Sequence, residues 1–524
     1  MTKKQCPLIK INQWFDSWNM RDWSANDGPG EPPKEFYVGA MKIRTLRRLA
    51  GVDVRDIRKR KANSLAPGYQ RGHDKERSET IARYIRYGYP LSTQKGLDPH
   101  EHKDLVNPGW LPTAILMNII PRGGSREQDG KTIKIDDKRV LSIVETYGNC
   151  CLEYPANVDS DKTWKFGNNE LQPLEIIDGQ HRLFSVGPDE DTGDDYSVPV
   201  VFFNNLASQW QAYLFWVINV EPKRINTSLA FDLYPELRNS AWLERGEWIK
   251  VYQEHRAQEL TEALWRHENS PWRDRIELFG NRIEGHVSNA AFIRSLTASF
   301  IRGWKAETDD NMSKIGGLFG SVDKAGKSYV IKWKRSQQAA FLIAMWNAVH
   351  QAVKKSSASW VLACRKADSN IGKDQNPHRL DPAFAGIHTL LGTDQGVRAV
   401  SVIYNAIFQI QHEKLGLSEW KSDAVGEPST EVVSSALAEI QKRRAVLSFM
   451  DKVANELING FDWRTSSEPS IQDGELKKVQ GAYRGSSGYA LLQRELMHVL
   501  AKAKDPEISK AASDVIKLLS WQKK

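Results

Sequence analysis

The sequence predicts an α/β domain in the N-terminal part, followed by a mainly α-helical domain. Before about residue 236, short apolar runs alternate with helical segments, as in domains built from strands and helices. Beyond that point the apolar residues recur at helical spacing over long segments. A chain of 524 residues is also too long for one ordinary core. We therefore expect an extension at 1–35, an α/β domain at 36–235 and a helical domain at 236–524.

The expected elements of the N-terminal part follow from local patterns. Residues 1–35 form an extended lead-in that the Gly/Pro-rich stretch 28–33 interrupts. A helix over 78–85 has Ser78 as its N-cap and ends at Gly88. Apolar runs predict strands at 111–120, 139–144, 174–177 and 196–203, and a helix at 207–220.

The C-terminal part contains long segments with one apolar face, which predict helices that pack on one another. These helices are expected at 241–266, 336–354, 397–412, 430–457, 490–503 and 508–519. Residues 413–429 and 464–488 are expected to be loops.

Five consecutive polar or small residues, Asp178-Gly179-Gln180-His181-Arg182, separate a predicted strand from a predicted helix. A helix start presents backbone N–H groups and a partial positive charge to an anion. Gly179 permits close approach of the backbone, and His181 and Arg182 supply donors and charge. Gln180 is suited to orient a water or a base edge, and Asp178 to hold a metal ion or accept a proton. An alternative is a structural turn in which Asp178 caps the helix and Arg182 makes an ion pair.

This string resembles the motif of the DGQHR-domain family, which is related to the ParB/sulfiredoxin-like fold group and includes DndB- and DpdB-like proteins. In that group a Gly-containing turn with a downstream arginine contacts nucleotide phosphates. Looser similarity to the family occurs at 68–71, 77–85, 110–115, 215–219 and 223–226. The resemblance covers roughly residues 36 to 300. Sulfiredoxin has a cysteine in its turn where this chain has Gln180, so sulfinic-acid reduction is not expected.

The resemblance implies a ParB/sulfiredoxin-like mixed sheet with helices for the N-terminal α/β domain. It also implies a site and its ligands. Asp178, Gln180, His181 and Arg182 would be catalytic, ATP or another NTP would be the nucleotide, and Asp178 would bind Mg²⁺. Residues that surround the nucleotide would be Gly179, Arg71, Arg77, Asn219, Lys223 and Arg224.

A basic segment precedes the motif. Between Lys42 and Arg86 there are 14 Lys/Arg and 5 Asp/Glu, within a chain of net charge +8. Cations beside tyrosines are suited to follow a nucleic-acid backbone and stack bases, although a solvated helix face is an equal alternative. The candidate DNA-binding residues are Arg55, Arg58, Lys59, Arg60 and Lys61.

Other patterns are weaker. The stretch 320–328 has one residue too many for a phosphate-binding P-loop, and a hairpin turn is preferred. The acidic run 189–195 and the pair His100 and His102 are metal candidates, but solvated loops are preferred for both. The four cysteines lack zinc-ligand spacing, which favours free thiols. No apolar run reaches the length of a membrane span and the start lacks a secretory signal, so we expect a cytoplasmic protein that does not enter membranes.

Two functions follow as expectations. One is a nucleotide-hydrolysing, ATPase-like component of a DNA-modification system, which acts with a base-exchanging, transglycosylase-like partner enzyme. The other is a DNA-binding transcriptional regulator of a phosphorothioation-type system, with the basic segment on the phosphates. Nuclease activity, known among ParB-like relatives, is a third option. The oligomeric state is left open.

Overall fold

Contacts divide the chain of the computed structural model into two compact units, Met1–Arg224 and Ile225–Lys524. The expected domain boundary was between residues 235 and 236. The structure describes residues 2–20, 23, 30–51, 74–128, 131–161, 164–167, 170–187, 196–219, 231, 233–237, 243, 249–278, 285–302, 315–319, 331–367, 381–422 and 428–521.

The first unit is built on a mixed sheet of eight strands in the order β3-β9-β4-β10-β2-β1-β8-β7. The pairs β10/β4 and β3/β9 are parallel, and the other neighbours are antiparallel. A separate hairpin joins β5 to β6. The strands are β1 (Lys3–Asn12), β2 (Glu35–Lys42), β3 (Ala50–Gly51), β4 (Ile115–Ile119), β5 (Ser125–Gln128), β6 (Lys131–Lys134), β7 (Ser142–Thr146), β8 (Asn149–Pro155), β9 (Leu174–Asp178) and β10 (Ser197–Asn204).

The expected N-terminal lead-in is instead part of this sheet. Strand β1 lies between β2 and β8 and pairs with both. Its buried residues Cys6 and Leu8 alternate with exposed ones, which is the period-two pattern of a half-buried strand. Residues 3–12 therefore contribute to the core of the first unit.

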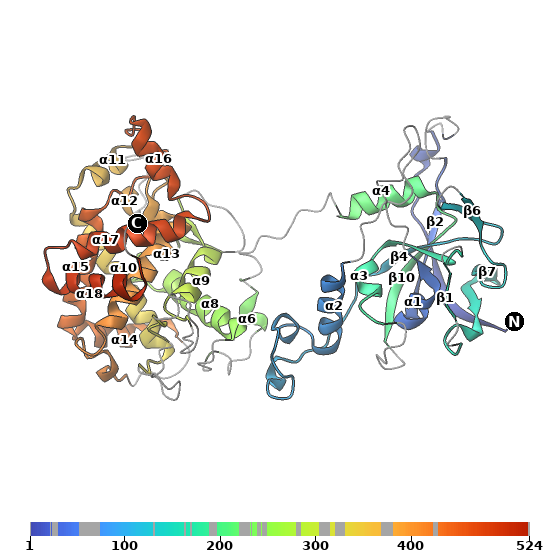
Figure 1. Ribbon diagram of the computed structural model, residues 1–524, viewed down its shortest axis with the longest axis horizontal. Helices are drawn as coiled ribbons and strands as arrows, with labels where there is room; N and C mark the ends of the chain where they lie inside the picture. The colour runs from blue at the N-terminus through green and yellow to red at the C-terminus, as the bar shows by residue number, and fades with distance from the viewer. Residues whose placement is uncertain are drawn as a thin grey trace. The chain divides into compact units, whose positions relative to one another are not determined.

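Among the described residues of the first unit, four α-helices accompany the sheet: α1 (Ile43–Leu49), α2 (Lys75–Tyr87), α3 (Gln180–Leu183) and α4 (Ser208–Asn219) (Figure 1). Helix α4 packs on β9, α3 packs on β4, and α2 packs on α3. Strand β9 and the turn after it therefore lie among three of the four helices.

The second unit is helical, as expected, and one large apolar core extends through it. Helix α10 is buried on nearly all sides and contacts α8, α14 and α15, while α13 contacts α9, α17 and α18. A two-stranded parallel sheet joins β11 (Ile276–Glu277) to β12 (Val287–Ser288). The helices are α6 (Tyr234–Leu237), α8 (Lys250–Arg266), α9 (Asn289–Ala298), α10 (Arg335–Lys355), α11 (Ser359–Ala367), α12 (Pro382–Ala385), α13 (Asp394–Ile410), α14 (Thr430–Gln441), α15 (Arg444–Gly460), α16 (Gly474–Ala482), α17 (Gly488–Ala501) and α18 (Pro506–Leu518).

Two expectations for this unit are wrong in detail. The single helix expected at 430–457 is two helices, α14 and α15, because the chain leaves the helical conformation at Arg443. The Arg443 guanidinium donates to the Gly416 carbonyl at 2.6 Å, which fixes the break from a distant loop. The loop expected at 464–488 contains α16, whose N-cap is Asp473.

Candidate functional site: the turn after strand β9

An irregularity in β9 decides which way its two acidic side chains point. Leu116 of β4 pairs with Asp178 and Met117 pairs with Ile176, so Ile177 is an extra residue in β9. Because neighbouring side chains of a strand alternate between faces, Glu175 and Asp178 would otherwise lie on opposite faces. With the extra residue, Glu175 and Asp178 both accept hydrogen bonds from helix α4.

The turn that follows requires glycine. Gly179 has φ +94°, in the left-handed region, and is the N-cap of the four-residue helix α3. A Cβ at this position would lie 2.9 Å from Nη2 of Arg182 and 3.2 Å from Cγ2 of Ile115. The strand, glycine turn and first helical turn expected from the sequence are therefore present, and the Arg182 guanidinium lies against the turn.

Asp178, Arg182 and Asn219 come together at this point. One oxygen of Asp178 accepts from Arg182 Nη2 at 2.8 Å, and the other accepts from Asn219 Nδ2 at 3.2 Å. Arg182 Nη2 also lies 3.3 Å from the carbonyl oxygen of Ala114. The side chains of the ion pair are 18% and 20% exposed, so a ligand can still reach them. Asn219 therefore meets the turn, as the resemblance implies, but Asp178 is engaged as the partner of Arg182.

This arrangement does not fit Mg²⁺ on Asp178. Both carboxylate oxygens accept hydrogen bonds from N–H donors, and the nearest charged neighbour is a cation. A hard divalent ion requires several oxygen ligands. Within the described part of the chain, no three His, Cys, Asp or Glu side chains are grouped to hold a metal. In this arrangement Asp178 is placed to position Arg182, and its expected role as a base stays a prediction.

His181 faces helix α2, and Gln180 lies beside His181. Nδ1 of His181 lies 3.5 Å from Oγ of Ser78, and its Nε2 lies 3.5 Å from Nε2 of Gln180. Gln180 is only 9% exposed, so it does not present its amide to solvent as a water-orienting residue would. Ser78 was expected to be the N-cap of α2, but it is buried beside His181. The N-cap is Asp74, whose side chain accepts a hydrogen bond from the backbone N–H of Arg77.

The remaining expected site residues are less well placed or undescribed. The exposed side chain of Arg77 has no hydrogen bond or ion pair to the turn among the residues that the structure describes. The other expected ligand and DNA-binding residues lie outside the described residues: Arg71, Lys223, Arg224, Arg55, Arg58, Lys59, Arg60 and Lys61. The P-loop-like stretch 320–328 and the acidic run 189–195 also lie outside them.

Three arginines of the basic segment have structural contacts. The Arg47 guanidinium lies 4.0 Å from the ring centre of Phe184, and burial lowers its pKa. Arg48 donates to the carbonyls of Val158 and Asp161, both at 2.9 Å. Arg83 donates to those of Leu91 and Gln94. These three cations are therefore not free to follow a nucleic-acid backbone.

A polar network around Glu175 is a feature that the sequence did not indicate. Glu175 accepts from Arg126 at 2.6 and 2.9 Å, from Asn118 at 2.7 Å and from Gln211 at 3.1 Å. Asn118 and Gln211 are almost fully buried, and both also bond the backbone of Leu206 at the start of α4. The network fixes α4 on β9, and α4 carries Asn219 to the turn. Only an isolated acid within the apolar run 174–177 signals it in the sequence.

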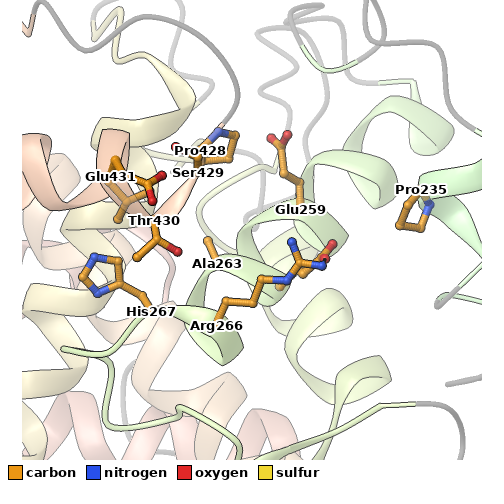
Figure 2. A pocket seen from close by; sticks show the side chains of 11 residues that line it. Pro235, Glu259, Ala263, Arg266, His267, Pro428, Ser429, Thr430 and Glu431 are labelled. Carbon is orange, nitrogen blue, oxygen red and sulfur yellow. Dashed lines mark ion pairs between the residues drawn. The ribbon is translucent and has the colours of Figure 1, made fainter.

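The second unit contains a pocket of about 460 Å³ beside α8 and the start of α14. Figure 2 shows His267 and Thr430 on one side of it and Pro235 on the other. Two of its three acids, Glu262 and Glu259, are ion-paired with Arg266 and Arg335, respectively, while Glu431 lies in the first turn of α14. Most of its charge is thus already compensated within the protein.

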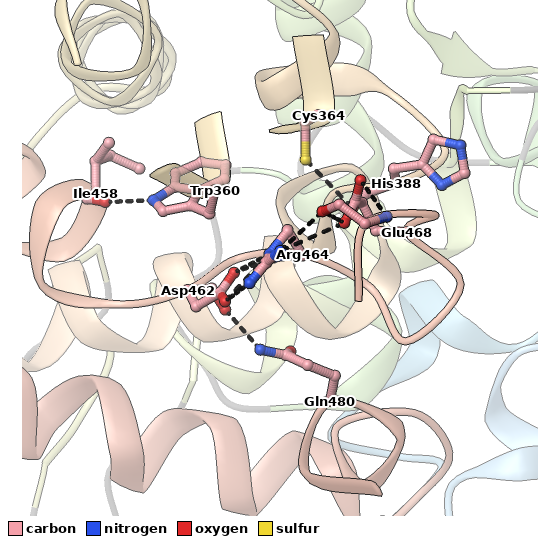
Figure 3. A network of polar contacts seen from close by, with 9 residues as sticks. Trp360, Cys364, His388, Ile458, Asp462, Arg464, Glu468 and Gln480 are labelled. Atoms are coloured by element: carbon pink, nitrogen blue, oxygen red, sulfur yellow. Dashed lines mark hydrogen bonds and ion pairs between the residues drawn. The ribbon is translucent and has the colours of Figure 1, made fainter. Parts of the chain in front are cut away.

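A second polar cluster in this unit is structural. Arg464 lies between Asp462 and the buried Glu468, with the Asp462 contact at 2.7 Å (Figure 3). Cys364 lies beside it, and burial raises the pKa of this thiol to about 12, which makes it unreactive. The cluster anchors the segment between α15 and α16.

Comparison with protein-family models, curated proteins and solved structures finds no match to this chain. The family resemblance therefore rests on the residues that carry it. Across the described segments, every helix is too short or too polar to span a membrane.

Proposed function

We propose that the turn between β9 and α3 binds the phosphate groups of a nucleotide. On this proposal the chain is the nucleotide-hydrolysing component of a cytoplasmic DNA-modification system and acts with a base-exchanging, transglycosylase-like enzyme. The observation that supports it is the convergence of Asp178, Arg182 and Asn219 from β9, α3 and α4. The identity of the ligand as ATP or another NTP, and the link to DNA, come from the resemblance of residues 178–182 to the DGQHR motif.

On this proposal the residues of the motif have different roles and are not a set of equivalent catalytic residues. Arg182 is the residue that would donate charge-assisted hydrogen bonds to phosphate, with His181 beside it. Asp178 and Asn219 are positioning residues, because their hydrogen bonds hold the guanidinium at the turn. The Asp178 carboxylate also offsets the charge of Arg182, so recognition would depend on orientation more than on net charge.

The test is ATP binding and ATP hydrolysis by the purified full chain and its variants. Arg182→Ala should weaken ATP binding roughly 10- to 100-fold, as expected for loss of a hydrogen bond to a charged group. Asn219→Ala should weaken it less, because the amide acts only through Asp178. Arg182→Lys keeps the charge and tests whether the bidentate shape matters.

The control is Arg122→Ala. Arg122 is an exposed arginine that follows β4, at the end of the antiparallel β4/β9 pair away from the turn. Circular dichroism establishes that each variant is folded. Equal ATP affinity in Arg182→Ala, Arg122→Ala and the unmodified chain would refute the proposal.

A DNA-binding regulator is the second candidate, and the charge distribution favours it. The segment 42–86 has 14 Lys/Arg against 5 Asp/Glu, whereas the Asp178–Arg182 pair leaves the turn without net charge. Binding to duplex DNA should then weaken steeply with salt. Neutralising residues 58–61 should reduce the slope of this dependence, and an unchanged slope would exclude the segment as the DNA contact.

A further inference from the structure

An exposed aromatic cluster covers one part of the first unit. It combines residues from the segment around the short 3₁₀ helix η1 (Asp16–Met20) with residues from α4. We call it the aromatic patch; its members are Trp14, Phe15, Trp18, Trp23, Trp210, Tyr213 and Trp216.

Ring contacts connect most of the patch into one surface. Trp18 contacts Phe15 and Trp14 at centroid distances of 5.2 and 5.4 Å. Trp14 contacts Trp23 at 5.9 Å, and Trp23 contacts Trp210 of α4 at the same distance. Trp210 contacts Tyr213 at 5.5 Å, and Trp216 is one helical turn further along α4. Two segments that are almost 200 residues apart in sequence thus form a continuous apolar surface.

The patch exposes an apolar area comparable to the largest patch of a typical monomer, and such patches are often functional. Phe15 is 68%, Trp18 44%, Tyr213 53% and Trp216 49% exposed. At about 200 Å² per aromatic side chain, these four residues expose roughly 400 Å². A standard interface buries about 800 Å² on each partner. The four rings would therefore supply about half of such an interface, and Trp and Tyr are the residues that most often dominate its energy.

The chemistry of the patch disfavours nucleic acid as its occupant. Helix α4 has no charged residue, so it offers no cation to a phosphate backbone. Beside the patch, Lys34 Nζ lies 5.1 Å from the ring centre of Trp14, but this cation pairs with Glu31 at 3.4 Å. The indole N–H groups of Trp14, Trp23 and Trp210 already donate within the patch, to Asn19 Oδ1, the Trp18 carbonyl and the Gly30 carbonyl. Several rings also meet edge to face, which uses ring faces that base stacking would need.

We propose that the aromatic patch joins two copies of this chain. In a two-fold dimer the same surface is present on both sides, so it must be compatible with itself. An uncharged helix meets this requirement, because two copies of α4 can approach without like-charge repulsion. The exposed area is also sufficient for the apolar centre of an interface between copies. This inference does not depend on the nucleotide proposal.

The test is the mass of the full chain in solution, measured by light scattering after size exclusion across a range of concentrations. The unmodified chain should reach twice its mass of 59.5 kDa. Tyr213→Lys and Trp216→Lys place like charges at the interface and should raise the dimer dissociation constant by about 30-fold or more, as loss of an interface hot spot does. Both positions are half-exposed, so the substitutions should not unfold the chain.

The matched control is Trp110→Lys. Trp110 is 74% exposed in the same unit but lies outside the patch, so its replacement should leave the dimer intact. A mixture of Trp216→Lys and Trp216→Glu chains should restore dimers if this residue lies near the two-fold axis. A chain that is monomeric at every concentration would overturn the proposal, as would a dimer that the patch variants leave unchanged. Patch-dependent binding of a monomeric chain to single-stranded DNA, lipid vesicles or another protein would also overturn it and identify the occupant.

Discussion

Replacing Glu175 with alanine removes the acceptor that joins β9, β4, β5 and α4. Four N–H groups lose their partner: two of Arg126 and one each of Asn118 and Gln211. The two amide side chains are almost fully buried, so water does not readily replace the carboxylate. Breaking a buried pair costs about 3–5 kcal/mol. Arg126 is 26% exposed and can rehydrate in part, which places the expected loss near ~3 kcal/mol, at the lower end of that range.

The isosteric change Glu175→Gln separates the charge from the shape. Glutamine retains one acceptor and fills the same volume, so it should cost less than alanine, about 1–2 kcal/mol. The control is Glu145→Ala, since the Glu145 side chain is 51% exposed and pairs with Lys10 at the surface. Such exposed pairs contribute little to stability.

Hydrogen exchange measured by mass spectrometry is the appropriate assay, because a chain with two units does not unfold in one step. A loss of ~3 kcal/mol corresponds to roughly 100-fold faster exchange through unfolding of the first unit. The increase should appear in peptides of β4, β9 and α4 and not in those of α10. Exchange that changes less than about 3-fold in Glu175→Ala would show that the network does not hold α4 on the sheet.

Three further changes test individual features. Gly179→Ala places a methyl group in a left-handed conformation against the Arg182 guanidinium and should lower the stability of the first unit by about 1–2 kcal/mol; an unchanged melting temperature would contradict the strained turn. Arg464→Ala leaves the carboxylate of Glu468, which is 1% exposed, without its cation. In urea titrations this change should lower the free energy of unfolding by about 3–5 kcal/mol, and Arg464→Lys should lower it less. Burial lowers the pKa of His267 from 6.5, so the unfolded chain binds this proton more readily than the folded chain. The stability of the second unit should therefore fall as the pH decreases below about 6.5, and melting curves of His267→Gln between pH 7.5 and 5 should show a shallower fall.

Local patterns predicted much of the fold because they depend on residues close in sequence. The apolar run at 174–177 with a glycine after it specified β9, the turn and α3. The separation of an α/β part from a helical part was also predictable from the change in apolar spacing. The break between α14 and α15 was not, because residues 441–444 contain no helix breaker. At the break, Arg443 donates a hydrogen bond to a carbonyl 27 residues earlier, a contact that the local sequence does not indicate.

The candidate site was predictable in position but not in chemistry. The motif identified Asp178 and Arg182, yet an i,i+4 pair of opposite charges has two uses, ligand binding or mutual pairing. In the structure the two charges pair with each other. Asn219, 41 residues away, donates to the same carboxylate, and an extra residue in β9 turns Asp178 toward it. Neither feature is visible in a period or a spacing. The aromatic patch was hidden for the same reason, since Trp23 and Trp210 meet only in the folded chain.

The extra residue in β9 also determines what would be needed to transplant this turn into another protein. A graft of residues 178–182 onto a regular strand would direct the aspartate toward the other face of the sheet, away from a helix that carries an equivalent of Asn219. The portable unit therefore includes Ile177 with the turn, together with a helix that spans from Gln211 to Asn219. A five-letter motif search that ignores the preceding strand will accordingly accept sequences whose aspartate lies on the wrong side of the sheet.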